Sequence, residues 1–255
     1  MSKRIMVVPD SQVKPGVEVD FLNHIAQYIV DKKPDVVVHL GDFWDMPSLS
    51  SYDYGKKSFE GRRYKADIEA GNYAMSVLLQ PIFDEVGRLK RNKKKLWEPE
   101  LHFLLGNHEN RINRAVNDDA KLEGALGIHD LDLVDWAVHD FLDPLFIDGI
   151  AFNHYFTTGL AGRPAATANA QLNKQHQSCI AGHQQGLQIA TGKKADGTLL
   201  TSVIAGSGYP HEEAYLGIQG NKHWRGVLML NDVQPSGEFD LMPISLKYLR
   251  EKYGV

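Results

Sequence analysis

Residues 35–45 read DVVVHLGDFWD, and this stretch decides the fold class. Its apolar start, Val36 to Val38, predicts a buried strand, and Gly41-Asp42 turns the chain out of that strand. Upstream, residues 5–8 predict another short strand, and residues 18–33 predict a helix with an apolar stripe at helical spacing. Strand, helix and strand in this order form a βαβ unit, whose functional side chains gather at the carboxyl ends of the strands.

Five short polar clusters, each at the end of an apolar run, follow the same arrangement. Their carboxylates, amides and imidazoles are therefore expected at one rim of the sheet. Side chains of these types bind divalent cations, and a pair of cations can activate water against a phosphate ester. The clusters are Asp10-Ser11-Gln12, Gly41-Asp42-Phe43-Trp44-Asp45, Gly106-Asn107-His108-Glu109, Asn153-His154 and Gly182-His183-Gln184-Gln185.

The rest of the chain mixes helical and strand patterns and contains no repeat and no linker. The predicted helices are 67–95, 110–124, 132–140 and 165–174. The further predicted strands are 101–105, 150–152, 178–181, 187–192, 198–205, 226–231 and 238–243. We expect a single domain over residues 1–255, with an insertion on the substrate side at about 46–100.

Composition is that of an ordinary globular protein. The chain has 255 residues, 43% of them apolar, and a net charge of −4, which gives no overall attraction to nucleic acid or anionic membrane. The single cysteine, Cys179, excludes an internal disulfide and a cysteine-based zinc site. Because the N-terminus runs directly into a strand and no apolar stretch reaches about 20 residues, we expect a cytoplasmic protein with no membrane segment.

The five clusters resemble the motifs of the calcineurin-like metallophosphoesterase superfamily. That pattern is D-x-H, G-D-x-x-D, G-N-H-[D/E], a lone His and G-H-x-H, and it spans residues 10–185 here. The second and third motifs match in full. The resemblance implies an α/β fold, a four-layer α-β-β-α sandwich with two mixed sheets. It also implies hydrolysis of a phosphate ester by a metal-activated hydroxide.

The resemblance assigns metal-binding roles residue by residue. Asp42 would bridge two cations, and Asn107, His154 and His183 would complete the second site. The implied ligands of the first site are Asp10, Asp42, Gln12 and Gln185, the glutamines standing where the family has histidines. Amide oxygens are weaker and harder donors than imidazoles, so we expect a tight second site and a labile first site. Manganese is favoured, with Mg²⁺, Fe²⁺ and Zn²⁺ as alternatives. A centre that works with one metal remains open.

Catalytic and substrate-binding roles follow from the same comparison and from residue chemistry. His108 would face the leaving-group oxygen as a general acid oriented by Asp45, since an imidazole beside a carboxylate titrates near neutral pH. Glu109 was interpreted as a helix cap without a catalytic role. Arg111, Arg114 and Arg163 are candidates for binding the phosphate, because a guanidinium matches phosphate oxygens.

The substrate class is less constrained. Aromatic residues alternate with cations at 52–64, directly after Asp45, which favours a phosphodiesterase or nuclease-like enzyme acting on a nucleotide or nucleic acid. A phosphomonoesterase is an alternative. A protein phosphatase is disfavoured. In protein phosphatases an arginine follows the second motif, and Met46-Pro47 stands there in this chain. A non-catalytic metal-binding scaffold is the third hypothesis. No membrane and no partner protein are implied.

Overall fold

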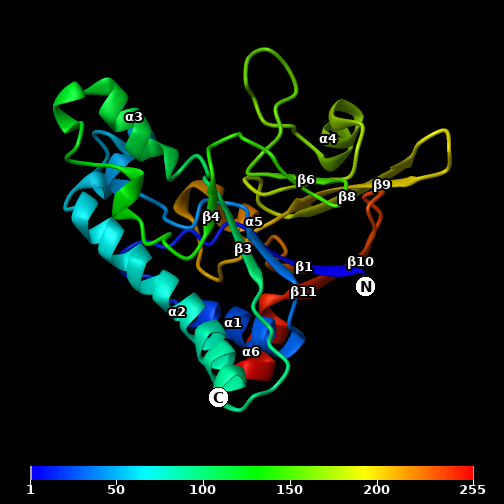
Figure 1. Cartoon of the computed structure of the whole chain (residues 1–255). Coiled ribbons are helices and arrows are strands. Elements are labelled where there is room, and N and C mark those ends of the chain that lie inside the picture. Colours follow the sequence, from blue (N-terminus) through cyan, green and yellow to red (C-terminus); the bar gives the residue numbers. More distant parts are fainter. Residues whose placement is uncertain (1, 255) are drawn as a thin grey trace.

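The structure is a computed structural model that describes residues 2–254. Figure 1 shows two sheets with helices on their outer sides. Within the described residues, every helix is too short or too polar to cross a bilayer.

The first sheet is mixed and has the order β11-β10-β1-β2-β3-β4. Strands β1 to β4 run parallel, whereas β10 is antiparallel to both β1 and β11. Its strands are β1 (Lys3–Val8), β2 (Val36–His39), β3 (Glu100–Leu104), β4 (Ala137–His139), β10 (Gly226–Val233) and β11 (Asp240–Ser245). The parallel strands all point their carboxyl ends in one direction, as the βαβ pattern predicts.

The second sheet is also mixed, with the order β5-β6-β7-β9-β8. Strands β6, β7 and β9 are parallel, and β5 and β8 are antiparallel edges. Its strands are β5 (Leu145–Ile147), β6 (Ile150–Asn153), β7 (Cys179–Ala181), β8 (Leu187–Lys193) and β9 (Leu199–Ala205). The strands predicted at 187–192 and 198–205 are confirmed as β8 and β9, which form an antiparallel hairpin.

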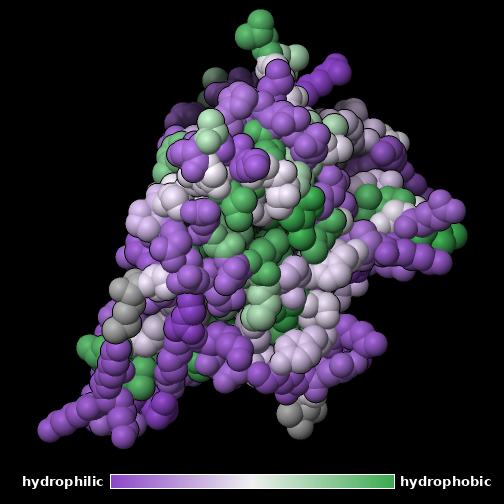
Figure 2. Space-filling model, turned by 90° about the vertical axis from the view of Figure 1, so that its right-hand side faces the viewer, coloured by the Kyte–Doolittle hydropathy of each residue, from purple (hydrophilic) through white to green (hydrophobic). Residues whose placement is uncertain are grey.

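The alternating direction of side chains along the strands explains the layers of helices and sheets. Ile5 and Val7 of β1 pack between the two sheets, whereas Met6 and Val8 pack under the helices. Because successive side chains of a strand point to opposite faces, a strand that is apolar throughout must be covered on both sides. The α-β-β-α sandwich is therefore confirmed. On the face seen in Figure 2, apolar residues gather in a band across the middle, between mostly polar regions.

Helices α1, α2 and α6 lie together on the outer side of the first sheet, and α4 covers β8 and β9. Two further helices, α3 and α5, lie in connections. The helices are α1 (Asp20–Lys32), α2 (Tyr64–Arg91), α3 (Asn110–Asp118), α4 (Ala168–Gln175), α5 (Gly217–Gly220) and α6 (Leu246–Tyr253). Short 3₁₀ turns occur at Pro47–Leu49, Ser51–Asp53, Lys57–Phe59, Ala120–Leu122, Ile128–Asp130 and Ala214–Leu216.

Two local predictions were wrong. The helix expected at 132–140 is replaced by β4, which pairs in parallel with β3. Trp136 is buried and its ring lies 5.8 Å from that of Phe103, so packing on an open sheet edge outweighs helical spacing. Helix α6 was not predicted; Ser245 caps it by accepting a hydrogen bond from the Tyr248 N–H.

The segment predicted as an insertion at 46–100 divides into two parts. Its first part, residues 47–62, consists of short turns that follow Asp45. Its second part is α2, which packs on α1 and contributes Ala74, Met75 and Leu78 to the core. Pro81 lies inside α2 without ending it. The helical part therefore packs within the outer helical layer of the first sheet.

Gly71 of α2 makes room for Trp44, and a substitution tests this packing. A Cβ at Gly71 would lie 1.8 Å from Cδ1 of the buried indole. We expect Gly71→Ala to lower the free energy of unfolding by about 2 kcal/mol or more, because overpacking outweighs the gain of up to about 1 kcal/mol in helix propensity. Urea denaturation measures the change.

Gly87→Ala is the matched control for Gly71→Ala. Gly87 lies on the same helix, and its added Cβ would meet only the flexible end of Arg91, at 3.3 Å. It should be neutral or stabilise the protein by up to about 1 kcal/mol. Equal effects of the two substitutions would contradict the packing of Trp44 against α2.

Candidate metal centre

The five polar clusters lie in the loops that follow five parallel strands. Asp10, Asp42 and Asn107 come two or three residues after β1, β2 and β3 of the first sheet. His154 and His183 follow β6 and β7 of the second sheet. The two sheets thus bring residues from distant parts of the sequence to one site.

The four residues predicted for the second metal site lie together. One donor atom each from Asp42, His154 and His183 fall within 4.8 Å of one another. Oδ1 of Asn107 is 2.9 Å from Nε2 of His154. His154 Nδ1 lies 2.8 Å from the Leu40 carbonyl oxygen and donates to it, which orients the ring and directs Nε2 toward Asp42.

Asp10 contributes a buried carboxylate with one oxygen unused. Its Oδ1 accepts a hydrogen bond from the His183 N–H at 3.0 Å. Its Oδ2 is buried and has no hydrogen-bond partner within residues 2–254. Burial and the neighbouring Asp42 carboxylate raise the pKa of Asp10 to about 7. A bare oxygen beside a second carboxylate suits a cation, so the residues present fit a metal.

The charges in the centre are strongly coupled. Burial alone would raise the pKa of Asp42, but the imidazoles of His108 and His154 lower it. Burial opposes protonation of His154, yet Asp42 raises the pKa of that imidazole to about 9. Burial lowers the pKa of His183 to about 4, which keeps its ring neutral and able to ligate. The Asp42 carboxylate therefore already faces a positive group where a cation would bind.

Two motif glycines are required by close approach. A Cβ at Gly106 would lie 2.2 Å from Asp42 Oδ1, and one at Gly182 would lie 2.5 Å from Asp10 Oδ1. Both distances are far below van der Waals contact. The glycines of these two motifs therefore allow the loops to pass directly beside the carboxylates of Asp42 and Asp10.

The two glutamines predicted for the first site are engaged by hydroxyl groups. Oε1 of Gln185 accepts hydrogen bonds from Ser207 and, at 2.9 Å, from Tyr209. An amide oxygen has two lone pairs, so Gln185 has none left for a cation in this arrangement. Oε1 of the buried Gln12 lies 3.5 Å from the Tyr215 hydroxyl. Gln185 is thus occupied by two donors, whereas Gln12 has this one long contact, so Asp10, Asp42 and Gln12 remain candidate ligands of the proposed first site.

His108 and Asp45 lie together as predicted. His108 Nδ1 is 2.8 Å from Asp45 Oδ1, and its Nε2 is 3.6 Å from Asp42 Oδ2. The His108 N–H also donates to Asp42 Oδ1 at 2.9 Å. Burial opposes a charge on His108, but Asp42 and Asp45 raise its pKa. The pair therefore lies directly beside the Asp42, His154 and His183 cluster that could hold a metal ion.

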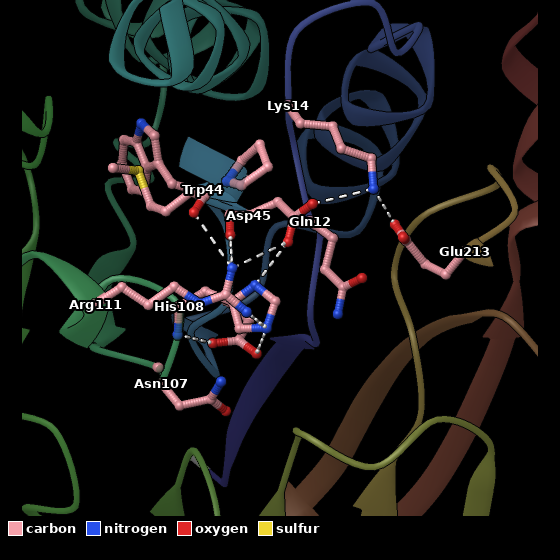
Figure 3. A network of polar contacts seen from close by, with 12 residues as sticks. Gln12, Lys14, Trp44, Asp45, Asn107, His108, Arg111 and Glu213 are labelled. Atoms are coloured by element: carbon pink, nitrogen blue, oxygen red, sulfur yellow. Dashed lines mark hydrogen bonds and ion pairs between the residues drawn. The ribbon is translucent and has the colours of Figure 1, made fainter. Parts of the chain in front are cut away.

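The three arginines predicted to bind phosphate have different surroundings. Arg111 lies against the His108–Asp45 pair: Nη2 is 3.0 Å from His108 Nε2, and Nη1 donates to the Asp45 carbonyl oxygen at 2.8 Å. Figure 3 shows this contact. Arg114 is exposed, and its Nη2 is 3.4 Å from Ser51 Oγ. Arg163 is exposed in the 155–164 loop. Of the three, Arg111 alone contacts His108 and Asp45.

Glu109 has a role that the sequence analysis missed. It is fully buried, and its carboxylate accepts four backbone hydrogen bonds of 2.7–3.0 Å. Oε1 binds the N–H groups of Phe43 and Trp44, and Oε2 binds those of Asp42 and Gly106. Glu109 thus fastens the loop that carries Asp42 to the loop that carries Asn107. Its position after the third motif was a signal, but the sequence does not show where the side chain points.

Comparison with known proteins gives limited matches in sequence. No family model matches the chain. The chain is 38% and 36% identical over 84 residues to the Gene 54 proteins of Mycobacterium phages L5 and D29. Each match covers 33% of this chain and 32% of the relative. The chain thus spans about a third of the length of these curated relatives.

Solved structures resemble the chain over nearly its whole length but at low scores. One is a predicted phosphoesterase from Streptococcus pneumoniae TIGR4, with a TM-score of 0.40 and 10% identity over 97% of this chain and 91% of that one. Another is Yfce from E. coli, with a TM-score of 0.37 and 10% identity over 95% and 99% of the two chains. Both are named as phosphoesterases. Structural similarity at this level does not support a conclusion about function. That conclusion depends on the residues of the site.

Proposed function

We propose that the chain is a metal-dependent phosphoesterase of the calcineurin-like type. The observation that carries this proposal is the grouping of Asp42, His154 and His183 within 4.8 Å, beside the His108–Asp45 pair. Carboxylate and imidazole donors gathered at one buried rim suit a transition-metal ion. A histidine held by a carboxylate next to them suits proton transfer to a leaving group.

Each residue of the centre has a separate task. Asp42, Asn107, His154 and His183 would hold one cation, and Asp10 with Asp42 a second. The cations would supply an activated water and neutralise charge on the phosphate. His108 would give a proton to the departing oxygen from Nε2, so Arg111 must leave that nitrogen when substrate binds. Asp45 would orient the imidazole through the ion-pair contact of its Oδ1 with Nδ1, at 2.8 Å.

We further propose that the first site is labile and that Mn²⁺ is the favoured metal. In support, the oxygen of Gln185 is taken by two hydroxyls and that of Gln12 faces Tyr215. Asp10, the shared Asp42 and the weakly contacted Gln12 are then the ligands available to the first cation, without the second glutamine. An all-oxygen site of this kind favours Mn²⁺ or Mg²⁺ over Zn²⁺.

A phosphodiester of a nucleotide or nucleic acid is the substrate that the surroundings favour. Tyr52 and Tyr54 are 81% and 84% exposed in the segment that follows Asp45, and Lys57 and Arg63 are exposed beside them in sequence. Arg114 reaches this segment through Ser51. Exposed aromatic rings among cations can stack on bases and bind phosphates. A phosphomonoesterase remains the alternative, and a non-catalytic metal-binding scaffold is the other.

Hydrolysis of bis-p-nitrophenyl phosphate and p-nitrophenyl phosphate with added Mn²⁺ tests the proposal. We expect the wild-type protein to cleave the diester, and His108→Ala to lower the rate of this cleavage about 10²–10⁴-fold. We also expect Tyr52→Ala/Tyr54→Ala to weaken binding of a labelled single-stranded oligonucleotide while bis-p-nitrophenyl phosphate is cleaved normally. Tyr73→Ala, an exposed tyrosine on α2, is the control. A preference for the monoester would favour the alternative, and no turnover with metal bound would favour the scaffold.

A further inference from the structure

A chain of five ionisable side chains runs through the catalytic pair to a segment far away in sequence. Lys14 Nζ lies 3.0 Å from Asp45 Oδ2 and 2.5 Å from Glu213 Oε1. Nε2 of His211 lies 3.0 Å from the same Glu213 oxygen. The order is His108, Asp45, Lys14, Glu213, His211, and Figure 3 shows Lys14 reaching between the two carboxylates.

We infer that Lys14, held by Glu213, is a positioning residue that fixes the Asp45 carboxylate for His108. The inference rests on the proposed function, because it concerns the residues that would protonate the leaving group. Neither Lys14 nor Glu213 belongs to the five motifs.

The two oxygens of Asp45 have separate partners. Oδ1 faces His108 Nδ1 at 2.8 Å, and Oδ2 faces Lys14 at 3.0 Å. With Lys14 in place, both oxygens of the Asp45 carboxylate have a charged partner, which fixes the orientation of the carboxylate plane. Without it, Oδ2 loses this ion pair and the carboxylate can rotate. The imidazole then loses its fixed orientation toward the reacting phosphate.

Glu213 is itself held firmly. Its N–H donates to Asn221 Oδ1 at 2.8 Å, and Asn221 Nδ2 donates back to the Glu213 carbonyl oxygen at 2.8 Å. His211 stacks on Tyr209, with ring centroids 4.4 Å apart. Tyr209 also donates to Gln185. The segment 207–215 therefore contacts two parts of the centre. Ser207 and Tyr209 bind Gln185, and Glu213 binds Lys14 beside Asp45.

Stability alone is a weak reason for this arrangement. A partly buried ion pair contributes little net free energy, because removing both charges from water offsets their attraction. A comparable pair, Lys33 and Glu85, joins α1 to α2 away from the centre. The side-chain exposures are 23% and 7% for Lys14 and Glu213, and 35% and 10% for Lys33 and Glu85. Lys33→Met is therefore a matched control that removes an equivalent lysine without touching the catalytic pair.

The first experiment needs no turnover. In long-range ¹H–¹⁵N spectra of protein labelled at histidine, the signal of His108 is assigned by its loss in His108→Ala. We expect Lys14→Met and Glu213→Gln to shift the Nδ1 resonance of His108, Lys14→Arg to restore it, and Lys33→Met to leave it unchanged. An unchanged Nδ1 resonance in folded Lys14→Met overturns the inference, whether or not the protein hydrolyses any ester.

The second experiment compares two diesters with Mn²⁺ present. When the P–O bond to the leaving group breaks, its electron pair goes to that oxygen, which takes the proton of His108. Diphenyl phosphate, with a poor leaving group, depends on this proton more than bis-p-nitrophenyl phosphate does. We expect Lys14→Met to lower kcat about 10- to 100-fold for diphenyl phosphate and less than about 3-fold for the other, with KM unchanged.

The outcomes separate the inference from the proposed function. Recovery of kcat in Lys14→Arg and wild-type rates in Lys33→Met support the inference. Equal losses on both diesters, or wild-type rates in Lys14→Met, overturn it. A wild-type protein that cleaves neither diester contradicts the proposed function instead, and the His108 resonance then decides the inference by itself.

Discussion

The Asp42→Asn variant is expected to bind Mn²⁺ at least about 100-fold more weakly than the wild-type protein. Loss of a residue that merely orients a ligand costs 10- to 100-fold in metal affinity, and Asp42 is the carboxylate common to both proposed sites. Its backbone has a φ of 51°, which asparagine adopts readily, and the amide oxygen can still accept from the His108 N–H. Electron paramagnetic resonance of free Mn²⁺ during a titration measures the affinity.

Hydrolysis should fall by about 10³-fold or more in the same variant, since metal-ion stabilisation of the reaction is worth several kcal/mol. The control is Asp67→Asn. Asp67 is an equally buried acid that accepts from the Ser48 N–H at 2.9 Å, outside the proposed metal ligands. Wild-type titrations should show one tight and one weak Mn²⁺. Unchanged Mn²⁺ binding in folded Asp42→Asn would remove the basis of the metal centre.

The placement of the site was predictable because it depends on strand ends. In a parallel sheet, polar residues that follow buried strands meet at one edge, so Asp10, Asp42 and Asn107 could be grouped from the sequence. The same rule applied to His154 and His183 on the second sheet. The α-β-β-α layering was implied by the family resemblance, and strands that are apolar on both faces, such as Val36–Val38, agree with it.

Side-chain direction was not predictable in the same way. Arg111 was a candidate for binding phosphate, and the sequence did not show that α3 places it against His108 and the carbonyl oxygen of Asp45. Lys14 and Glu213 are 199 positions apart, and no local pattern links them. The engagement of Gln185 by Ser207 and Tyr209 likewise depends on how the segment after β9 returns to the centre. Such contacts arise from tertiary packing rather than from motifs.

The position of Glu109 was visible in the third motif, but the direction of its side chain was not. Its substitution should have the largest effect on stability. Glu109→Gln keeps the size of the side chain but leaves one oxygen to serve four N–H donors. The amide NH₂ would then face two of them, the N–H groups of either Asp42 and Gly106 or Phe43 and Trp44. Each buried N–H without an acceptor costs about 1–3 kcal/mol, so we expect the free energy of unfolding to fall by about 3–5 kcal/mol. Urea denaturation measures it.

Glu85→Gln provides the control for this substitution. Glu85 is also mostly buried, but its carboxylate binds Lys33 and Arg88, whose own charged groups reach solvent. Loss of that pairing should cost less than about 1 kcal/mol. If Glu109→Gln were as mild as Glu85→Gln, the four backbone bonds could not be what fastens the Asp42 loop to the Asn107 loop. Gly41, Asp42 and Gly106 lie in close contact, so any separation of the two loops would move the Asp42 carboxylate. Another interaction would then have to hold the loops together.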